Sequence, residues 1–284
     1  MTAVLVAYLT LVCFAANSLL CRMALGGHRI DPISFTSIRL VSGALALLLL
    51  SRLLVPGPVP PAGGGSWRSG FALLAYAVTF SLAYVTLNAG MGALLLFGSV
   101  QVTMFAAALT AGERPGPAQW LGSGAAVAGL VYLVLPGISA PDPVGALLMA
   151  VAGVAWGFYS IRGRGVTTPV AMTAGNFARS VPLALVAAAL VCTTLRAEPM
   201  GVVLALVSGV VTSGLGYILW YRTLRHLTTA QAAVVQLIVP VLAAFGGVTF
   251  LGERVSIRLI AGSVLILGGV ALAVMKRSPA VRAS

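Results

Sequence analysis

The chain has 284 residues, of which 60% are apolar and only 8% are charged, and its formal net charge is +12. Soluble domains carry about 25% charged residues, so this composition excludes an ordinary soluble protein and indicates one that lies in a membrane. The 17 basic residues are scattered singly or in pairs between apolar runs, without the dense basic patch that binds phosphate backbones. We therefore expect no nucleic-acid partner.

Ten apolar runs are long enough to cross a bilayer, which takes roughly 20 helical residues. Backbone groups inside a bilayer must pair within the protein, and this forces such runs into helices. The sequence thus predicts an all-α polytopic membrane protein with ten transmembrane helices. Their expected ranges are 2–25, 33–55, 69–88, 91–111, 117–136, 143–162, 169–195, 200–221, 229–251 and 256–275.

Two stretches of the chain share one pattern at an offset of 140 positions. Residues 110–129 read TAGERPGPAQWLGSGAAVAG and residues 250–269 read FLGERVSIRLIAGSVLILGG. Arg39 and Arg179 repeat at the same offset, and the segment Phe14 to Arg22 matches Trp156 to Arg164 at 142. These repeated patterns predict that a five-helix unit occurs twice in the chain.

The expected domains are residues 1–136 and 142–276, followed by a cytoplasmic tail at 277–284. Because five is odd, the second unit enters the membrane from the opposite side, as in the inverted repeats of many secondary transporters. We expect both termini in the cytoplasm, because ten basic residues outside the helices then lie inside and five lie outside. Arg22 and Arg29, which follow the first helix, are a local signal against this orientation.

The Gly-Glu-Arg elements are interpreted as structural corners. Gly112 and Gly252 are placed to end one helix, and Glu113 and Glu253 then lie near the positive N-terminal end of the next. The glycines that follow lie seven residues apart on one helical face and predict packing seams, either within one chain or between two chains. They are Gly122 with Gly129, and Gly262 with Gly269. A monomer and a homodimer both stay open.

Arg39 and Arg179 stand several residues inside apolar runs, where an unpaired charge is costly. Two explanations stay open for them: they bind backbone carbonyls or extend to the interface, or they attract a substrate carboxylate. The acidic residues are all expected at helix ends or in loops, so no carboxylate is available inside the membrane as a proton relay. They are Asp31, Glu113, Asp142, Glu198 and Glu253.

Aromatic residues mark a candidate substrate path. Tyr76, Phe80 and Tyr84 recur every four residues, and Asn88 continues the series. Their hydroxyl groups need partners in a dry interior, which either a moist cavity or interhelical hydrogen bonds would supply. Further candidates for substrate binding are Trp156, Tyr159, Tyr217, Asn17, Ser99, Gln101 and Gln236.

Two other positions carry specific expectations. Pro240 lies inside the predicted ninth helix and would free the carbonyl of Gln236, which suggests a bendable gate. Trp220 and Tyr221 adjoin Arg222 at a helix end, so we interpret them as interfacial belt residues.

No enzymatic site is expected. The three cysteines form no CxxC and have no histidine nearby to complete a zinc site. The chain has no phosphate-binding Walker loop, HExxH or GxSxG motif. We therefore expect no metal, no cofactor and no catalytic residues.

The chain resembles the EamA-type, ten-helix members of the drug/metabolite transporter superfamily over essentially its whole length. The resemblance is carried by GYILWYRTLRHLTTAQAAVVQLIVPVLAAFGGVTFLGERVSIRLIAGSVLILGGVALA and by VAWGFYSIRGRG. In the first half Phe14 stands where the family often has Trp, and Val100 where it often has Pro. The aromatic stripe and the lack of a membrane carboxylate are similar to the YddG-type exporters of aromatic and other amino acids.

The resemblance implies a bacterial inner-membrane exporter with a central cavity, working by alternating access. We expect it to export small metabolites, most readily aromatic or apolar amino acids, without ATP and without obligatory proton coupling. The alternatives are an exporter of cationic drugs or other metabolites, and a membrane scaffold or receptor that transports nothing. Substrate rank is not determined by the sequence.

Overall fold

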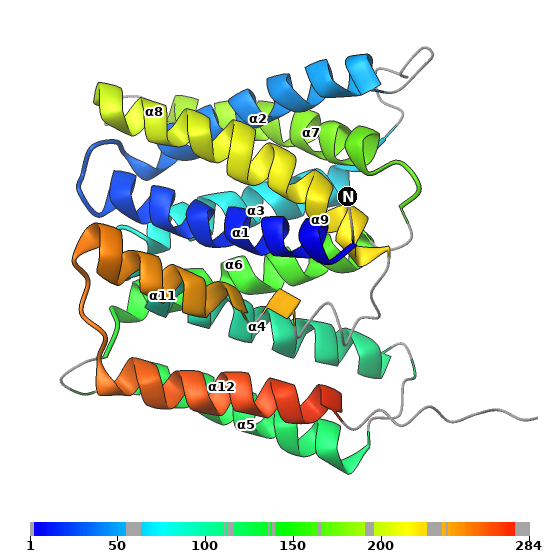
Figure 1. The fold of residues 1–284 in the computed structure, drawn as a ribbon. Coiled ribbons are helices and arrows are strands. Elements are labelled where there is room, and N and C mark those ends of the chain that lie inside the picture. Colours follow the sequence, from blue (N-terminus) through cyan, green and yellow to red (C-terminus); the bar gives the residue numbers. More distant parts are fainter. Residues whose placement is uncertain are drawn as a thin grey trace, which may run out of the picture.

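The computed structural model describes residues 3–54, 64–110, 112, 116–135, 137, 140–163, 166–190, 196–225, 235–236 and 238–275. Within these ranges every regular element is helical, and the helices lie side by side with roughly parallel or antiparallel axes (Figure 1). In the described part of the chain, seven helical runs are long and apolar enough to cross a membrane, and two shorter apolar helices accompany them. The predicted all-α polytopic fold is confirmed.

The helices of the first half follow the predicted ranges closely. They are α1 (Ala3–Leu25), α2 (Pro32–Leu54), α3 (Trp67–Ala83), α4 (Ala89–Thr110) and α5 (Pro117–Val134). The third ends five residues earlier than predicted, so Tyr84 is its C-cap and Asn88 lies outside it, just before α4. Asn88 therefore does not continue the aromatic stripe as predicted.

The second half contains α6 (Pro143–Arg162), α7 (Pro169–Leu190), α8 (Pro199–Val207), η2 (Ser208–Leu215), α9 (Gly216–Leu224), α11 (Ile238–Leu251) and α12 (Ile257–Met275). The elements α8, η2 and α9 form one continuous span from Pro199 to Leu224. Proline occupies the first position of several helices, where its missing N–H is not needed. Asp31 accepts hydrogen bonds from the backbone N–H groups of Ile33 (3.0 Å) and Ser34 (2.8 Å) at the start of α2.

The glycines of the two Gly-Glu-Arg elements lie at opposite ends of the helix bundle. Gly112 (φ 81°) and Gly252 (φ 65°) both adopt the left-handed conformation that was predicted for helix ends. Gly112 follows the end of α4, whereas Glu253 accepts a hydrogen bond from Ala89 N (2.9 Å) at the beginning of α4. A helix of this length spans about 33 Å. Gly112 and Glu253 therefore lie on opposite sides, as inverted repeats require.

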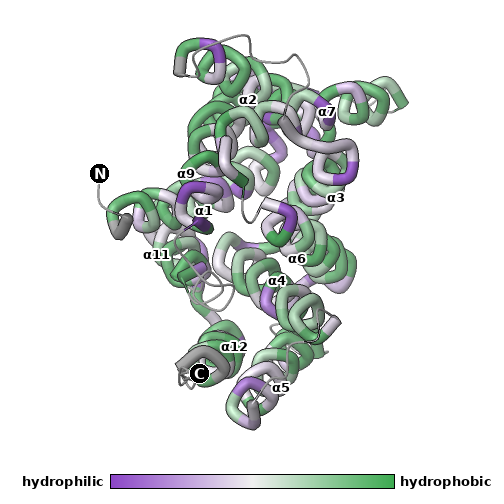
Figure 2. Tube along the Cα trace, turned by 90° about the vertical axis from the view of Figure 1, so that its right-hand side faces the viewer, coloured by the Kyte–Doolittle hydropathy of each residue, from purple (hydrophilic) through white to green (hydrophobic). Residues whose placement is uncertain are grey.

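The glycine seams pack two helices of one chain together. A Cβ atom built on Gly269 of α12 would lie 2.5 Å from the Gly122 carbonyl oxygen of α5, and one on Gly129 would lie 2.7 Å from Ile266. Only glycine permits so close an approach, and the predicted packing role is confirmed for this helix pair. Figures 1 and 2 show α5 and α12 together at one edge of the bundle.

Large apolar side chains cover the outside of the bundle, and polar side chains gather within it. Leu190 and Ile257 are 81% and 83% exposed, whereas Asn17 and Arg39 are 3% and 1% exposed. Viewed along the helices, the chain is mostly hydrophobic on its periphery (Figure 2). This distribution suits a protein surrounded by lipid with a polar interior.

Candidate substrate-binding site

A small cavity lies where helices of both halves meet. In this conformation it has room for about one water molecule. Helices α1, α3 and α4 of the first half and α6 and α9 of the second supply its walls. The lining residues are Phe14, Asn17, Ser18, Tyr76, Phe80, Leu96, Phe97, Trp156 and Tyr217.

Trp156 is the centre of an aromatic cluster in this wall. Its ring contacts Tyr217 (4.7 Å between centroids), Tyr76 (5.1 Å), Phe14 (5.4 Å) and Tyr159 (5.4 Å). Such ring pairs contribute about 0.5–1.5 kcal/mol each beyond the burial of their area. The cluster therefore joins α1, α3, α6 and α9 and presents aromatic faces to the cavity.

Asn17 links the cavity to the second half of the chain. Its Nδ2 donates to the Tyr76 hydroxyl (3.2 Å), and its Oδ1 accepts from Ser208 Oγ (2.8 Å) and Thr212 Oγ1 (3.1 Å). Both lone pairs of this oxygen are thereby occupied. An amide held in this way offers a substrate a polar surface of fixed orientation.

Arg39 lies directly behind the aromatic wall and is almost completely buried. Its Nε donates to Ser213 Oγ (2.8 Å), and its Nη2 donates to the hydroxyl groups of Tyr217 (2.9 Å) and Tyr76 (3.3 Å). Its guanidinium carbon lies 5.3 Å and 5.4 Å from the ring centroids of Tyr76 and Phe80. Among the described residues, Arg39 Nη1 is the one buried side-chain nitrogen or oxygen without a hydrogen-bond partner.

The segment η2 is π-helical, which the sequence did not predict. Its hydrogen bonds from residue i to i+5 widen the helix. Ser208 and Thr212 of η2 bind Asn17, and Ser213 binds Arg39. Gly209 allows the close approach of α2, because a Cβ there would lie 2.4 Å from the Arg39 carbonyl oxygen. Turns of this kind are frequent at functional sites.

The structure brings together half of the predicted binding residues. Asn17, Tyr76, Phe80, Trp156 and Tyr217 all line the cavity. Their contact with a substrate stays a prediction.

Two further candidates lie in a second layer behind Trp156. Tyr159 stacks on its indole ring, and its hydroxyl accepts a hydrogen bond from Asn176 Nδ2 (3.4 Å). Gln236 Oε1 accepts from Trp156 Nε1 (3.3 Å). Both residues therefore hold the tryptophan in place.

Three other candidates are buried but do not line the cavity. The Tyr84 ring packs edge-on against Phe80 (4.7 Å), and its hydroxyl donates to the Ala89 carbonyl (3.3 Å). Ser99 packs against Gly153 of α6, where a built Cβ would lie 2.5 Å from its own Cβ. Gln101, two residues further along α4, is 7% exposed.

The cavity residues that the site prediction missed are Phe14, Ser18, Leu96 and Phe97. Phe14 could have been found from the repeat, because it is the counterpart of Trp156 at offset 142. The two rings touch edge to face at an interplanar angle of 88°. Leu96 and Phe97 belong to an unbroken apolar run with no periodic signal.

The belt interpretation of Trp220 and Tyr221 is wrong. Both side chains are buried, at 0% and 1% exposure. Trp220 Nε1 donates to Ser160 Oγ (3.3 Å), and Tyr221 stacks on Tyr159 (5.5 Å). The helix continues to Leu224, three residues beyond its predicted end, which places this pair inside the bundle.

The predictions for Arg179 and Pro240 differ in how the structure bears on them. Arg179 Nη1 donates to the carbonyls of Gly64 (2.7 Å) and Gly175 (2.9 Å), which is the carbonyl-binding explanation. Pro240 lies in the first turn of α11 as described, and residue 237 before it lies outside the described residues. The helix-break hypothesis therefore stays a prediction. The predicted corner residue Glu113 also lies outside the described residues.

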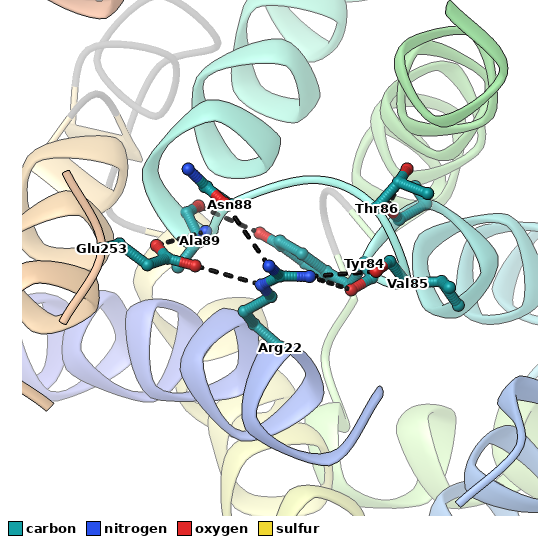
Figure 3. Close-up of polar contacts among 8 residues, drawn as sticks. Arg22, Tyr84, Val85, Thr86, Asn88, Ala89 and Glu253 are labelled. Atoms are coloured by element: carbon teal, nitrogen blue, oxygen red, sulfur yellow. Dashed lines mark hydrogen bonds and ion pairs between the residues drawn. The ribbon is translucent and has the colours of Figure 1, made fainter. Parts of the chain in front are cut away.

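A charged clasp lies at one end of the bundle (Figure 3). We use this name for Arg22 at the end of α1 together with Glu253 after α11. Arg22 Nε lies 3.1 Å from Glu253 Oε1, and Arg22 Nη1 donates to the carbonyls of Tyr84 (3.1 Å) and Val85 (3.0 Å). Glu253 Oε2 accepts from Ala89 N, so this carboxylate faces the N-terminal end of α4 and not, as predicted, that of the next helix.

These features define a multi-pass helical membrane protein whose two inverted halves enclose a polar and aromatic cavity. A model of the EamA-like transporter family matches the chain twice, over residues 1–135 and 143–275. The chain belongs to the EamA-like transporter family, which comprises membrane transporters of small molecules.

Two known proteins extend this comparison. Uncharacterized protein PA1977 of Pseudomonas aeruginosa is 50% identical over 273 residues, which cover 96% of this chain and 94% of that protein. A solved crystal structure, described only as that of a protein, has a TM-score of 0.67 at 20% identity and covers 94% of this chain and 98% of that one. The second likeness concerns the fold alone.

Proposed function

We propose that this protein exports small amphipathic metabolites, foremost aromatic or apolar amino acids, across the bacterial inner membrane by alternating access and without ATP. The observation that carries the proposal is the cavity between the two halves, whose wall combines six aromatic side chains with one amide. An apolar ring gains by burial against Trp156 and its neighbours, while Asn17 and the tyrosine hydroxyls offer hydrogen bonds to charged substrate groups.

The conformation described here supports a closed state of such a carrier. The cavity has room for about one water, so an amino acid requires the helices around it to separate. The clasp joins α1 and the loop before α4 to the corner after α11. It therefore links the first half to the second at the end that the basic residues predict to be periplasmic. Opening on that side requires this link to break.

We propose further that transport runs downhill or by exchange, without obligatory proton coupling. Four acids, Asp31, Asp142, Glu198 and Glu253, lie at helix ends or beyond them, and Glu113 lies outside the described residues. Uptake into vesicles down a substrate gradient should proceed at equal internal and external pH. If this downhill uptake occurred only when a pH gradient was imposed, this part of the proposal would be refuted.

The direct test is counterflow of labelled phenylalanine or tryptophan in liposomes. Trp156→Ala should abolish most of the protein-dependent flux, because it removes the ring at the centre of the cavity wall. The matched control is Trp120→Ala on α5, since Trp120 is 55% exposed on the outside of the bundle and contacts only Phe105 among the aromatic residues described. Equal flux in the two variants would contradict the assignment of the cavity.

Two other functions are outcomes of the same assay. Aromatic rings also bind quaternary cations, so a labelled quaternary ammonium compound belongs among the substrates. Protein-dependent flux of that compound alone would favour an exporter of cationic drugs. A scaffold or receptor would move none of these compounds.

A further inference from the structure

The three arginines described above have different electrostatic environments. Arg22 faces Glu253, and Arg179 binds two backbone carbonyls. Arg39 is the counterpart of Arg179 in the other repeat, yet it contacts neutral groups: three hydroxyl groups and two aromatic rings. Within the described residues this buried cation forms no ion pair.

A charge in this position is unfavourable unless an anion or a full set of hydrogen bonds compensates it. Among the described residues Arg39 has neither: it forms no ion pair, and its Nη1 is buried without a hydrogen-bond partner. Arginine stays protonated and presents its donors in a planar fork that suits a carboxylate. A carboxylate at this nitrogen would supply both the missing acceptor and the missing negative charge.

The guanidinium of Arg39 lies next to residues that line the cavity. The hydroxyl groups that its Nη2 contacts belong to Tyr76 and Tyr217, and its guanidinium lies over the Phe80 ring. All three of these residues line the cavity. The positive charge is therefore separated from the cavity by a single layer of side chains, and movement of the tyrosines would expose it.

We propose that Arg39 binds the carboxylate of the transported molecule, so that the carrier selects aromatic or apolar carboxylates and rejects the corresponding amines. This inference rests on the proposed function. It assigns the two charged ends of an amino acid unequal importance: the carboxylate is required, and the ammonium group is dispensable.

Competition against labelled phenylalanine in counterflow tests the proposal on the unaltered protein. Phenylpropionate, which lacks the ammonium group, should compete within about fivefold of phenylalanine. Phenethylamine, which lacks the carboxylate, should compete at least tenfold more weakly. Equal competition by the amine would overturn the inference and leave the proposed function intact.

Ligand binding measured by thermal shift separates failure of the anion site from failure of the proposed function. Phenylpropionate should raise the melting temperature of the purified protein, and phenethylamine at the same concentration should not. Stabilisation by phenylpropionate together with no counterflow of any amino acid would contradict the proposed function and retain the anion site. No stabilisation and no preference for the acid would overturn the anion site.

Substitutions then identify the residue. Arg39→Gln should reduce the preference for phenylpropionate over phenethylamine to near one, and Arg39→Lys should retain part of it. The matched control is Arg179→Lys in the other repeat, which should keep the full preference whatever its effect on stability. If Arg39→Gln does not fold, Arg39→Lys decides, and phenylpropionate should then raise its melting temperature less than that of the unaltered protein. An unchanged preference in every variant of Arg39 that folds would mean that Arg39 has a structural role only.

Discussion

Breaking the charged clasp should open one end of the protein. In Glu253→Gln the carbonyl of the amide still accepts from Ala89 N, but the charge that faces Arg22 is lost. The two side chains are only 20% and 12% exposed, so water screens the pair weakly. A hydrogen bond to a charged group contributes about 1.5–3 kcal/mol, and Arg22 retains the carbonyls of Tyr84 and Val85.

We therefore expect the closed state to lose about 2 kcal/mol, which lowers the ratio of closed to open molecules about 30-fold. The measurement is the reaction of Ser18→Cys, a cavity position, with a membrane-impermeant thiol reagent. The reagent is added on the side of the clasp, in a background in which Cys13, Cys21 and Cys192 are replaced by alanine. The reaction rate should rise by the same factor.

The matched control is Glu198→Gln. Glu198 lies at the same end of the bundle, where its N–H donates to the Arg29 carbonyl (2.8 Å), and its side chain makes no capping hydrogen bond to α8. The control should leave the reaction rate of Ser18→Cys unchanged. A rate in Glu253→Gln within twofold of the parent would refute the view that this ion pair keeps the end closed.

Two further substitutions test the packing. Gly269→Leu should lower the melting temperature by several degrees, because its Cβ would collide with the backbone of α5. The neighbouring Gly268→Leu should not lower it, because nothing lies within 4 Å of its built Cβ. Equal melting temperatures of the two variants would argue against the packing seam between α5 and α12. Trp220→Phe removes the hydrogen bond to Ser160 while keeping a ring. Differential scanning calorimetry should detect a loss of stability of about 0.6 kcal/mol or more. The same substitution of a tryptophan in an interfacial belt would cause no measurable loss of stability.

The helices and their inverted arrangement were predictable because they depend on the length of apolar runs and on the number of helices in each repeat. Pro32 and Pro117 begin helices, and Gly112 and Gly252 end them, for reasons that act within a few residues of the chain. Local signals of this kind are visible in a sequence. The bounds of most elements were accordingly close.

The site was only partly predictable because it depends on which helix faces meet. Tyr84 shares the helical stripe of Tyr76 and Phe80, yet its helix ends just before it and its ring lies beside the Ala89 carbonyl. Trp220 has the composition of an interfacial residue, but the helix runs on and places it inside. The π-helical turn leaves no periodic trace in the apolar pattern around Ser213.

The contact between Phe14 and Trp156 has a geometric consequence. Residues related by a two-fold operation touch only if both lie close to the rotation axis, as the contact of Phe14 with Trp156 shows for this pair. When the halves of an inverted repeat exchange their shapes, that operation carries each of these rings to the place of its counterpart, and their contact is its own image. In the proposed transport cycle, a molecule bound beside this pair therefore meets the same two rings whether it arrives from one face of the bilayer or departs through the other.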